Sequence, residues 1–248
     1  MAAPTLAAFA EVEAATASGV NVTTASVTWQ SGDVVVALCG TEGGTGGETL
    51  VTPTTTGSGI AFGTAQQVHN STGTDCGGGC WAAVASAGSS GTYSFNATHS
   101  SGNRNKLLGV YVVRGAGGIG NSAINVSATR TVSLTPTAAD GLICWIVLDW
   151  NADAAQTFTP TATTHTSGSP GPTASPVSVQ SSPLFTYYIG DLDDQTSAGA
   201  VSYGINGTGT GPFVIIAIEA KNAGGAPAAL PHGVLVAPNP AVTRAAVW

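Results

Sequence analysis

The sequence has 248 residues, of which only 8% are charged, and its formal net charge is −7. Soluble chains usually carry about one charged residue in four, and here no lysine or arginine precedes Arg104. This balance excludes nucleic acid and anionic membranes as partners, because both attract basic surfaces. The polar surface must come from Thr, Ser, Asn and Gly. Such a surface argues against a free cytosolic enzyme and favours a β-rich building block that packs against copies of itself or other subunits.

The first residues lack the cationic start and the long apolar centre of a signal peptide. No stretch of about 18 apolar residues is present, so no transmembrane helix is expected. We therefore expect a chain made in a cytoplasm, or one that is already processed.

Short apolar or alternating runs separated by turn residues predict an all-β fold, an antiparallel β-sandwich of jelly-roll type. The first run, residues 7–14, has helix-forming Ala and Glu but is predicted as a strand. The runs at 34–38, 142–148 and 213–218 are continuously apolar, which predicts central strands buried on both faces. The strands are predicted at residues 7–14, 21–29, 33–40, 60–70, 81–87, 91–100, 106–115, 122–128, 130–136, 141–150, 183–191, 200–207 and 212–222.

A weak internal echo links residues 25–38 to residues 132–148. Both run from a polar alternating strand through an Asp- and Gly-containing turn into a buried strand. We interpret this echo as the recurring hairpin of a single sandwich domain over residues 1–222, with loops at 40–59 and 160–182.

Residues 223–248 form a different segment, predicted as an extended, proline-rich docking tail. Proline disfavours regular helices and central strands, and the segment holds Pro227, Pro231, Pro238 and Pro240. Its apolar anchors are Val234, Leu235, Val236 and Trp248. We expect these anchors to dock on a neighbouring subunit.

The four cysteines divide into two kinds. Cys39 and Cys144 lie in apolar runs and are predicted to be buried thiols. Cys76 and Cys80 bracket three glycines, which favours a local disulfide across a flexible loop; half of a zinc site is the alternative.

The glycine-rich segment at 115–120, the aspartate run and the histidines also have simpler explanations than a functional site. The GAGGIG segment at 115–120 matches a dinucleotide-binding pattern, but the β-branched residues after it do not predict the required helix, so it is interpreted as a turn. Asp191, Asp193 and Asp194 are expected in a loop, as a candidate calcium site or a solvated acidic turn. Calcium is the cofactor that these aspartates could bind, and no other cofactor is expected beyond the zinc alternative at the cysteines. The histidines are scattered and are expected at the surface or in loops.

Two groups of side chains suggest contacts with partners. Trp81 and Trp150 are candidate platforms for stacking on sugars. Four of the six basic residues fall in a narrow stretch, which predicts one small basic zone for subunit contact. These residues are Arg104, Lys106, Arg114 and Arg130.

The order of these segments resembles that of β-sandwich structural proteins of tailed bacteriophages, over roughly residues 20–220. The resemblance rests on a W-x-x-G-D turn into a buried strand, on a strand that ends in Arg and Gly, and on a late D-G turn. The residues are Trp29, Gly32, Asp33, Val112, Val113, Arg114, Gly115, Asp140 and Gly141.

This resemblance implies a non-enzymatic virion structural protein on the exterior of the particle, either tail-associated or capsid-decorating. Its partners would be copies of itself and other virion proteins. The alternative is a carbohydrate-binding, receptor-binding module that recognises a glycan of the host surface.

Overall fold

The computed structural model describes residues 3–14, 21–43, 47–73, 75–100, 104–137, 139–149, 157–159, 186–195, 199–206 and 211–224. This part of the chain is all-β, with antiparallel sheets packed face to face, and it contains no helix. The predicted all-β sandwich is confirmed. The loop at 160–182 and residues 225–248 lie outside the described residues.

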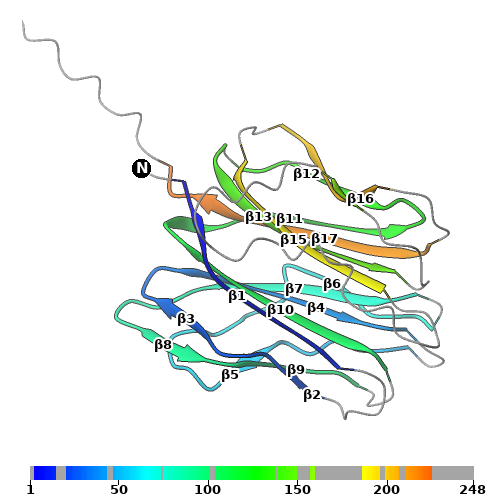
Figure 1. Ribbon diagram of the computed structural model, residues 1–248, viewed down its shortest axis with the longest axis horizontal. Coiled ribbons are helices and arrows are strands. Elements are labelled where there is room, and N and C mark those ends of the chain that lie inside the picture. The colour runs from blue at the N-terminus through cyan, green and yellow to red at the C-terminus, as the bar shows by residue number, and fades with distance from the viewer. Residues whose placement is uncertain are drawn as a thin grey trace, which may run out of the picture.

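Two inner sheets form the centre of the molecule (Figure 1). The first consists, in order across the sheet, of β1 (Thr5–Ala14), β10 (Lys106–Arg114), β4 (Val34–Thr41), β7 (Gly77–Val84) and β6 (Gln67–His69). The second consists of β11 (Ala116–Ser127), β17 (Phe213–Asn222), β13 (Gly141–Asp149) and β15 (Thr186–Gln195).

Each inner sheet is covered on its far side by smaller outer sheets, which gives four layers (Figure 1). The first inner sheet is covered by β2 (Asn21–Thr23), β9 (Phe95–Thr98) and β5 (Thr54–Thr55), and by the pair β3 (Val27–Gln30) and β8 (Ser90–Tyr93). The second is covered by β12 (Thr131–Leu134), β16 (Val201–Asn206) and β14 (Thr157–Thr159).

The two halves of the chain repeat one topology. The inner order β1-β10-β4-β7 corresponds to β11-β17-β13-β15, and the outer order β2-β9-β5 corresponds to β12-β16-β14. In each half the first inner strand pairs with the last, as in a jelly roll. Residues 1–222, which the sequence groups into one sandwich, thus contain two stacked jelly rolls. The internal echo marks equivalent connections from an outer to an inner sheet, β3 to β4 and β12 to β13. The expectation of a recurring hairpin is wrong, because the two strands of each connection lie in different sheets.

The double burial of the apolar runs follows from the four layers. Along β13, Leu142, Cys144 and Ile146 face the core between the inner sheets, which we call the shared core. The alternate residues Ile143 and Trp145 face the core beneath the outer sheet. An antiparallel strand usually has one polar face; here both faces are covered, so the strand has none.

Glycines let the two inner sheets approach closely. A Cβ at Gly40 would lie 2.5 Å from Leu148 Cδ2, and one at Gly109 would lie 2.2 Å from Ile189 Cδ1. Gly78, in the three-glycine run, faces the same core, where a Cβ would lie 2.8 Å from Val214 Cγ1. The run is therefore part of strand β7 and not a loop.

This placement contradicts the predicted disulfide. Cys76 and Cys80 are free and buried, one just before β7 and one within it. Four residues of extended chain span about 13 Å, whereas disulfide-bonded Cα atoms lie within about 7 Å. Cys39 and Cys144 are buried thiols, as predicted.

Other segments also differ from the sequence prediction. The strands predicted at 21–29 and 91–100 each divide between two outer sheets, and β5 and β14 were not predicted. The strand predicted at 60–70 is reduced to β6, because residues 60–66 take no regular structure. The GAGGIG turn is confined to Gly115, whose φ is +74°, and β11 begins at Ala116.

The close approach of the inner sheets can be tested at Gly78. In Gly78→Ala the new methyl group would lie 2.8 Å from Val214 Cγ1 and 2.9 Å from Leu148 Cδ1. We expect the free energy of unfolding, measured by urea titration, to fall by about 1–3 kcal/mol through overpacking. The control Gly63→Ala, where no heavy atom lies within 4 Å, should change it by less than about 0.5 kcal/mol. Equal effects of the two substitutions would contradict this packing.

Candidate functional site

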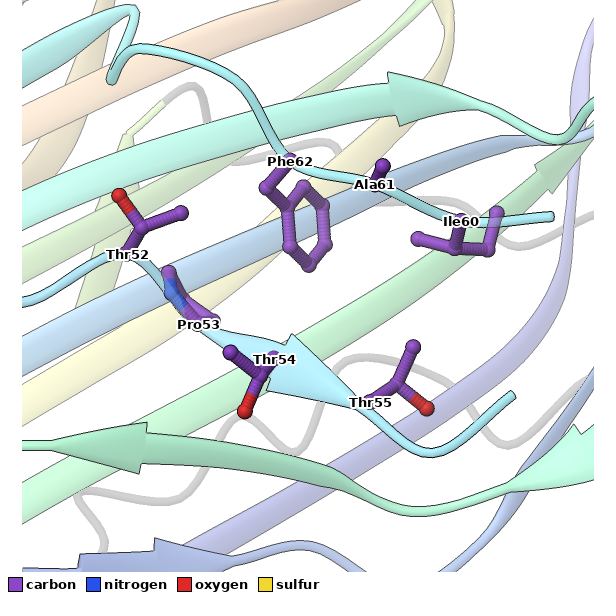
Figure 2. Close-up of a pocket in the computed structure, with 7 residues that line it drawn as sticks. All are labelled: Thr52, Pro53, Thr54, Thr55, Ile60, Ala61 and Phe62. Atoms are coloured by element: carbon purple, nitrogen blue, oxygen red, sulfur yellow. The ribbon is translucent and has the colours of Figure 1, made fainter. Parts of the chain in front are cut away.

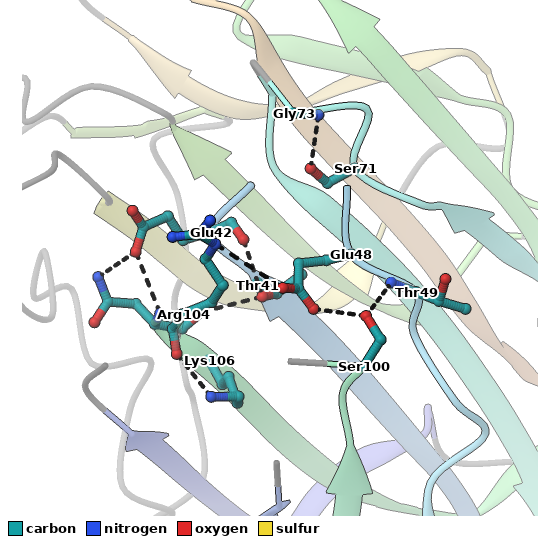
Figure 3. A network of polar contacts seen from close by, with 10 residues as sticks. Thr41, Glu42, Glu48, Thr49, Ser71, Gly73, Ser100, Arg104 and Lys106 are labelled. Atoms are coloured by element: carbon teal, nitrogen blue, oxygen red, sulfur yellow. Dashed lines mark hydrogen bonds and ion pairs between the residues drawn. The ribbon is translucent and has the colours of Figure 1, made fainter. Parts of the chain in front are cut away.

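Buried charged side chains gather at one end of the first inner sheet, where β4 ends and β10 begins (Figure 3). We call this group the polar end cluster. Its members are less than 4% exposed, apart from Arg104 at its rim. They are Glu42, Glu48, His99, Arg104, Asn105 and Lys106.

Hydrogen bonds hold the two glutamates of this cluster, although Glu42 Oε1 is buried without a hydrogen-bond partner among the described residues. Asn105 donates to Glu42 Oε2 from its side chain at 2.8 Å and from its backbone N–H at 3.3 Å. Ser100 Oγ donates to Glu48 Oε2 at 2.8 Å, and Arg104 Nε lies 3.9 Å from Glu48 Oε1. These contacts join β4 to the chain that enters β10, because Lys106 is the register partner of Thr41.

Burial shifts the pKa values of charged groups in the cluster. It raises the pKa of the Glu42 carboxyl, although hydrogen bonds from Asn105 and the charge of Arg104 oppose that shift. Burial lowers the pKa of the Lys106 ammonium, against the attraction of Glu48 and Glu42. Lys106 donates to the carbonyl oxygen of Arg104 at 2.8 Å. The cluster is therefore a set of mutually compensated charges inside the protein.

His99 is the buried imidazole of the cluster. It is 1% exposed, and its Nε2 lies 3.3 Å from the carbonyl oxygen of Gly40. Burial, together with the charge of Lys106, lowers its pKa to about 4. The expectation that the histidines lie at the surface or in loops is wrong for His99, because its spacing in the sequence carried no sign of burial.

A carboxylate–imidazole pair lies nearby, and among the described residues no nucleophile completes it. His69 Nε2 and Asp75 Oδ2 are 2.8 Å apart. Burial raises the pKa of Asp75, but hydrogen bonds from the Thr72 backbone and from His69 lower it by a larger amount. The net shift of this pKa is therefore downward. Within the described residues the His69 ring has no hydrogen bond to a hydroxyl or thiol, as a nucleophile–base pair would need. Asp75 also accepts from the Thr72 N–H at 2.7 Å, which makes the pair a loop clamp.

The thiol closest to these carboxylates is not an activated nucleophile. Burial raises the pKa of Cys76 well above its ordinary value, and the charges of Asp149, Asp75 and Glu42 raise it further. A reactive cysteine needs the opposite, a lowered pKa in a partly exposed and electropositive setting.

The four predicted subunit-contact cations do not form one basic zone. Lys106 and Arg114 lie at opposite ends of β10, about 26 Å apart by strand geometry. Arg104 belongs to the polar end cluster, and Arg130 is 8% exposed with its guanidinium 5.0 Å from the centre of the Phe213 ring. The expected single zone is wrong, because these cations lie far apart, and their contact with a subunit stays a prediction.

Arg114 connects two of the motifs on which the phage resemblance rests. Its Nε and Nη2 donate to Asp33 Oδ1 and Oδ2 at 3.2 Å and 3.0 Å. Asp33 also accepts from the backbone N–H of Gln30 at 2.9 Å. The aspartate of the W-x-x-G-D turn therefore ties the connection between β3 and β4 to the end of β10.

The acidic run at 191–194 lies in strand β15 and not in a loop, which removes the loop geometry expected for calcium. Asp191 is 1% exposed and lies close to buried Tyr111, whose pKa is raised by burial and by this charge. The side chains of Asp193 and Asp194 lie outside the described residues. In the part of the chain that the structure describes, no three His, Cys, Asp or Glu side chains are arranged to hold a metal ion.

The predicted sugar platform at Trp81 is wrong. Trp81 is 2% exposed and belongs to the core between the first inner sheet and its outer sheets. Trp150 and the predicted tail anchors Val234, Leu235, Val236 and Trp248 lie outside the described residues.

A small surface pocket lies at the free side of β5, in the outer layer of the first jelly roll. Residues 52–55 and 60–62 line it, and its volume is about 240 Å³. Figure 2 shows the two extended segments on either side of the hollow, with Phe62 and Pro53 lining it. Small-molecule sites usually measure about 300–1,000 Å³, so this pocket suits one or two side chains of a partner.

Comparison with protein-family models, with curated proteins and with solved structures finds no match. Among the described residues, no helix is long and apolar enough to cross a membrane.

The buried imidazole makes a testable prediction about acid stability. Unfolding returns the pKa of His99 from about 4 to about 6.5, so between these values the unfolded chain binds the additional proton. Stability should therefore fall as pH drops from 7 to 4, by roughly 3 kcal/mol from this group. Urea titrations at several pH values should show a shallower acid-side loss in His99→Gln. The same slope in both proteins would contradict the assignment.

Proposed function

We propose that this chain is a non-enzymatic structural protein of a tailed-bacteriophage virion. It is made in the host cytoplasm and carried on the exterior of the particle, as a tail-associated or capsid-decorating subunit. Its partners are copies of itself and other virion proteins. The resemblance in the order of the sequence motifs is one support for this proposal, and the ion pair between Asp33 and Arg114 gives two of these motifs a common structural purpose.

The observation that carries the proposal is the position of the ionisable side chains in the fold. The described ionisable side chains are largely engaged inside the fold: Glu42 with Asn105, Glu48 with Arg104 and Asp75 with His69. Buried Glu219 accepts from the N–H of Thr137 at 2.8 Å. The fold thus uses its charges to close turns and sheet ends.

The outer surface is built from short polar side chains instead. On the outer sheets Thr28 Oγ1 bonds Thr92 Oγ1 at 2.7 Å, and Thr98 Oγ1 donates to the Asn21 side chain at 2.8 Å. Lys and Glu lose much rotamer freedom when an interface covers them, and they are depleted from interfaces. A surface of Thr, Ser and Asn is covered at lower cost, which suits a subunit that packs against others repeatedly.

The alternative proposal, a carbohydrate-binding module, loses one of its two platforms because Trp81 is buried. It now depends on Trp150 and on binding to a glycan of the host surface. Glycan-array binding that disappears in Trp150→Ala would favour this alternative.

The proposed function is tested on purified particles. Density-banded virions of the phage that encodes this chain should contain it at a fixed number of copies per particle by quantitative mass spectrometry. Antibodies against it should label the particle exterior in electron microscopy. A protein that stays in the soluble lysate, with no fixed ratio to the particle, would contradict the proposal.

A further inference from the structure

The outer layer of the first jelly roll ends at a strand edge that faces a hollow. β5 pairs with β9 through Thr54 and Thr55, and it is the last strand of its sheet. Residues 60–62 run along the other side of the pocket without entering a strand (Figure 2). A free strand edge offers backbone N–H and C=O groups to an added strand.

The lining of this hollow is uncharged, with three threonines beside the apolar Pro53, Ile60, Ala61 and Phe62. Phe62 is half-buried and its ring packs 5.9 Å from that of Phe95, while Ile60 is 8% exposed and Pro53 is buried. Val51, directly before the lining residues, is 47% exposed and is one of the few large apolar side chains at the described surface. An extended segment with small apolar side chains and no acidic residue fits this chemistry.

The segment after β17 has these properties. Residues 225–248 contain no acidic residue and a single basic one, Arg244, and their run Val234–Val236 lies between Pro231 and Pro238. Proline is compatible with an added edge strand and disfavours helix. The 24 residues can extend over about 80 Å, far enough to reach another molecule.

Docking on the same molecule would take the segment around the first inner sheet, and cross-linking separates this case from docking between copies. β17 belongs to the second inner sheet, whereas β5 lies in the outermost layer of the first jelly roll (Figure 1). A segment leaving Gly224 would have to pass around the first inner sheet, because layers packed about 10 Å apart block the direct path. The ten residues up to Val234 extend over at most about 35 Å.

We propose that Val234–Val236 of one copy binds as an extended strand in the hollow between β5 and residues 60–62 of a neighbouring copy. This inference rests on the proposed structural function and names the surface through which subunits join. Strand addition supplies backbone hydrogen bonds, and the pocket accepts one or two apolar side chains. Repetition between copies converts a modest contact into a stable assembly.

Cysteine cross-linking of co-expressed full-length chains tests the contact. One chain carries Thr54→Cys, on the exposed edge of β5, and the other carries Leu235→Cys. All four native cysteines are buried, and burial raises the pKa of Cys80 to about 12, so they should not compete. The control replaces Thr54→Cys with Thr28→Cys, an exposed position on the other outer sheet.

We expect a mixed-chain dimer on non-reducing gels, at least fivefold more abundant than in the control pair. Equal cross-linking in the two pairs would overturn the proposal. Cross-linking found only when both cysteines sit in one chain would overturn docking between copies.

A charge pair provides a second measurement. Ala61→Glu places an acid in the hollow and should weaken self-association at least tenfold in sedimentation experiments, whereas Thr64→Glu, exposed and outside the lining, should not. Adding Leu235→Lys to Ala61→Glu should restore association. Equal association of Ala61→Glu and Thr64→Glu would overturn the docking site, while the presence of the chain in particles would still support the proposed function.

Discussion

The face-to-face contact of the two inner sheets is the constraint on which the rest of the molecule depends. The central strands of both sheets are buried on both faces, as β4 and β13 show, so neither sheet can lie at the surface. Each needs the other on one side and a smaller outer sheet on the opposite side, which produces four layers. Glycine at positions 40, 78 and 109 makes room for side chains of the opposite sheet, and an added Cβ would force Leu148, Val214 or Ile189 to shift.

The scarcity of charge follows from this architecture. An inner strand such as β13 has no solvated face on which to place a lysine or glutamate. Several charged side chains lie where strands begin and end, and there they are paired, as in the polar end cluster and in the Asp33–Arg114 contact. What is left for the outer surface is threonine, serine and asparagine, the side chains on which the proposal of a packed subunit depends.

Sequence reasoning found the strands that have a clear apolar pattern and missed what depends on long-range contacts. The run at 142–148 predicted a doubly buried strand, and β13 is one. The glycine run at 77–79 was predicted as a flexible loop but belongs to strand β7. The sequence could not show this, because the glycines are needed for the approach of Gly78 to the opposite sheet. The polar end cluster was only partly visible, through Arg104 and Lys106, because its acids and His99 come from distant segments. The repeated topology is visible in the sequence only as the weak echo between residues 25–38 and 132–148, because equivalent strands share an apolar pattern and not their residues.

The two jelly rolls share one core, and we therefore expect them to unfold together. Native-state hydrogen exchange of β4 and β13 in rising denaturant tests it directly, because these strands belong to different jelly rolls and both face the shared core. The account predicts that their slowest amides open with the same free energy and the same denaturant dependence. Amides of β13 that open at a lower free energy while β4 stays protected would contradict it.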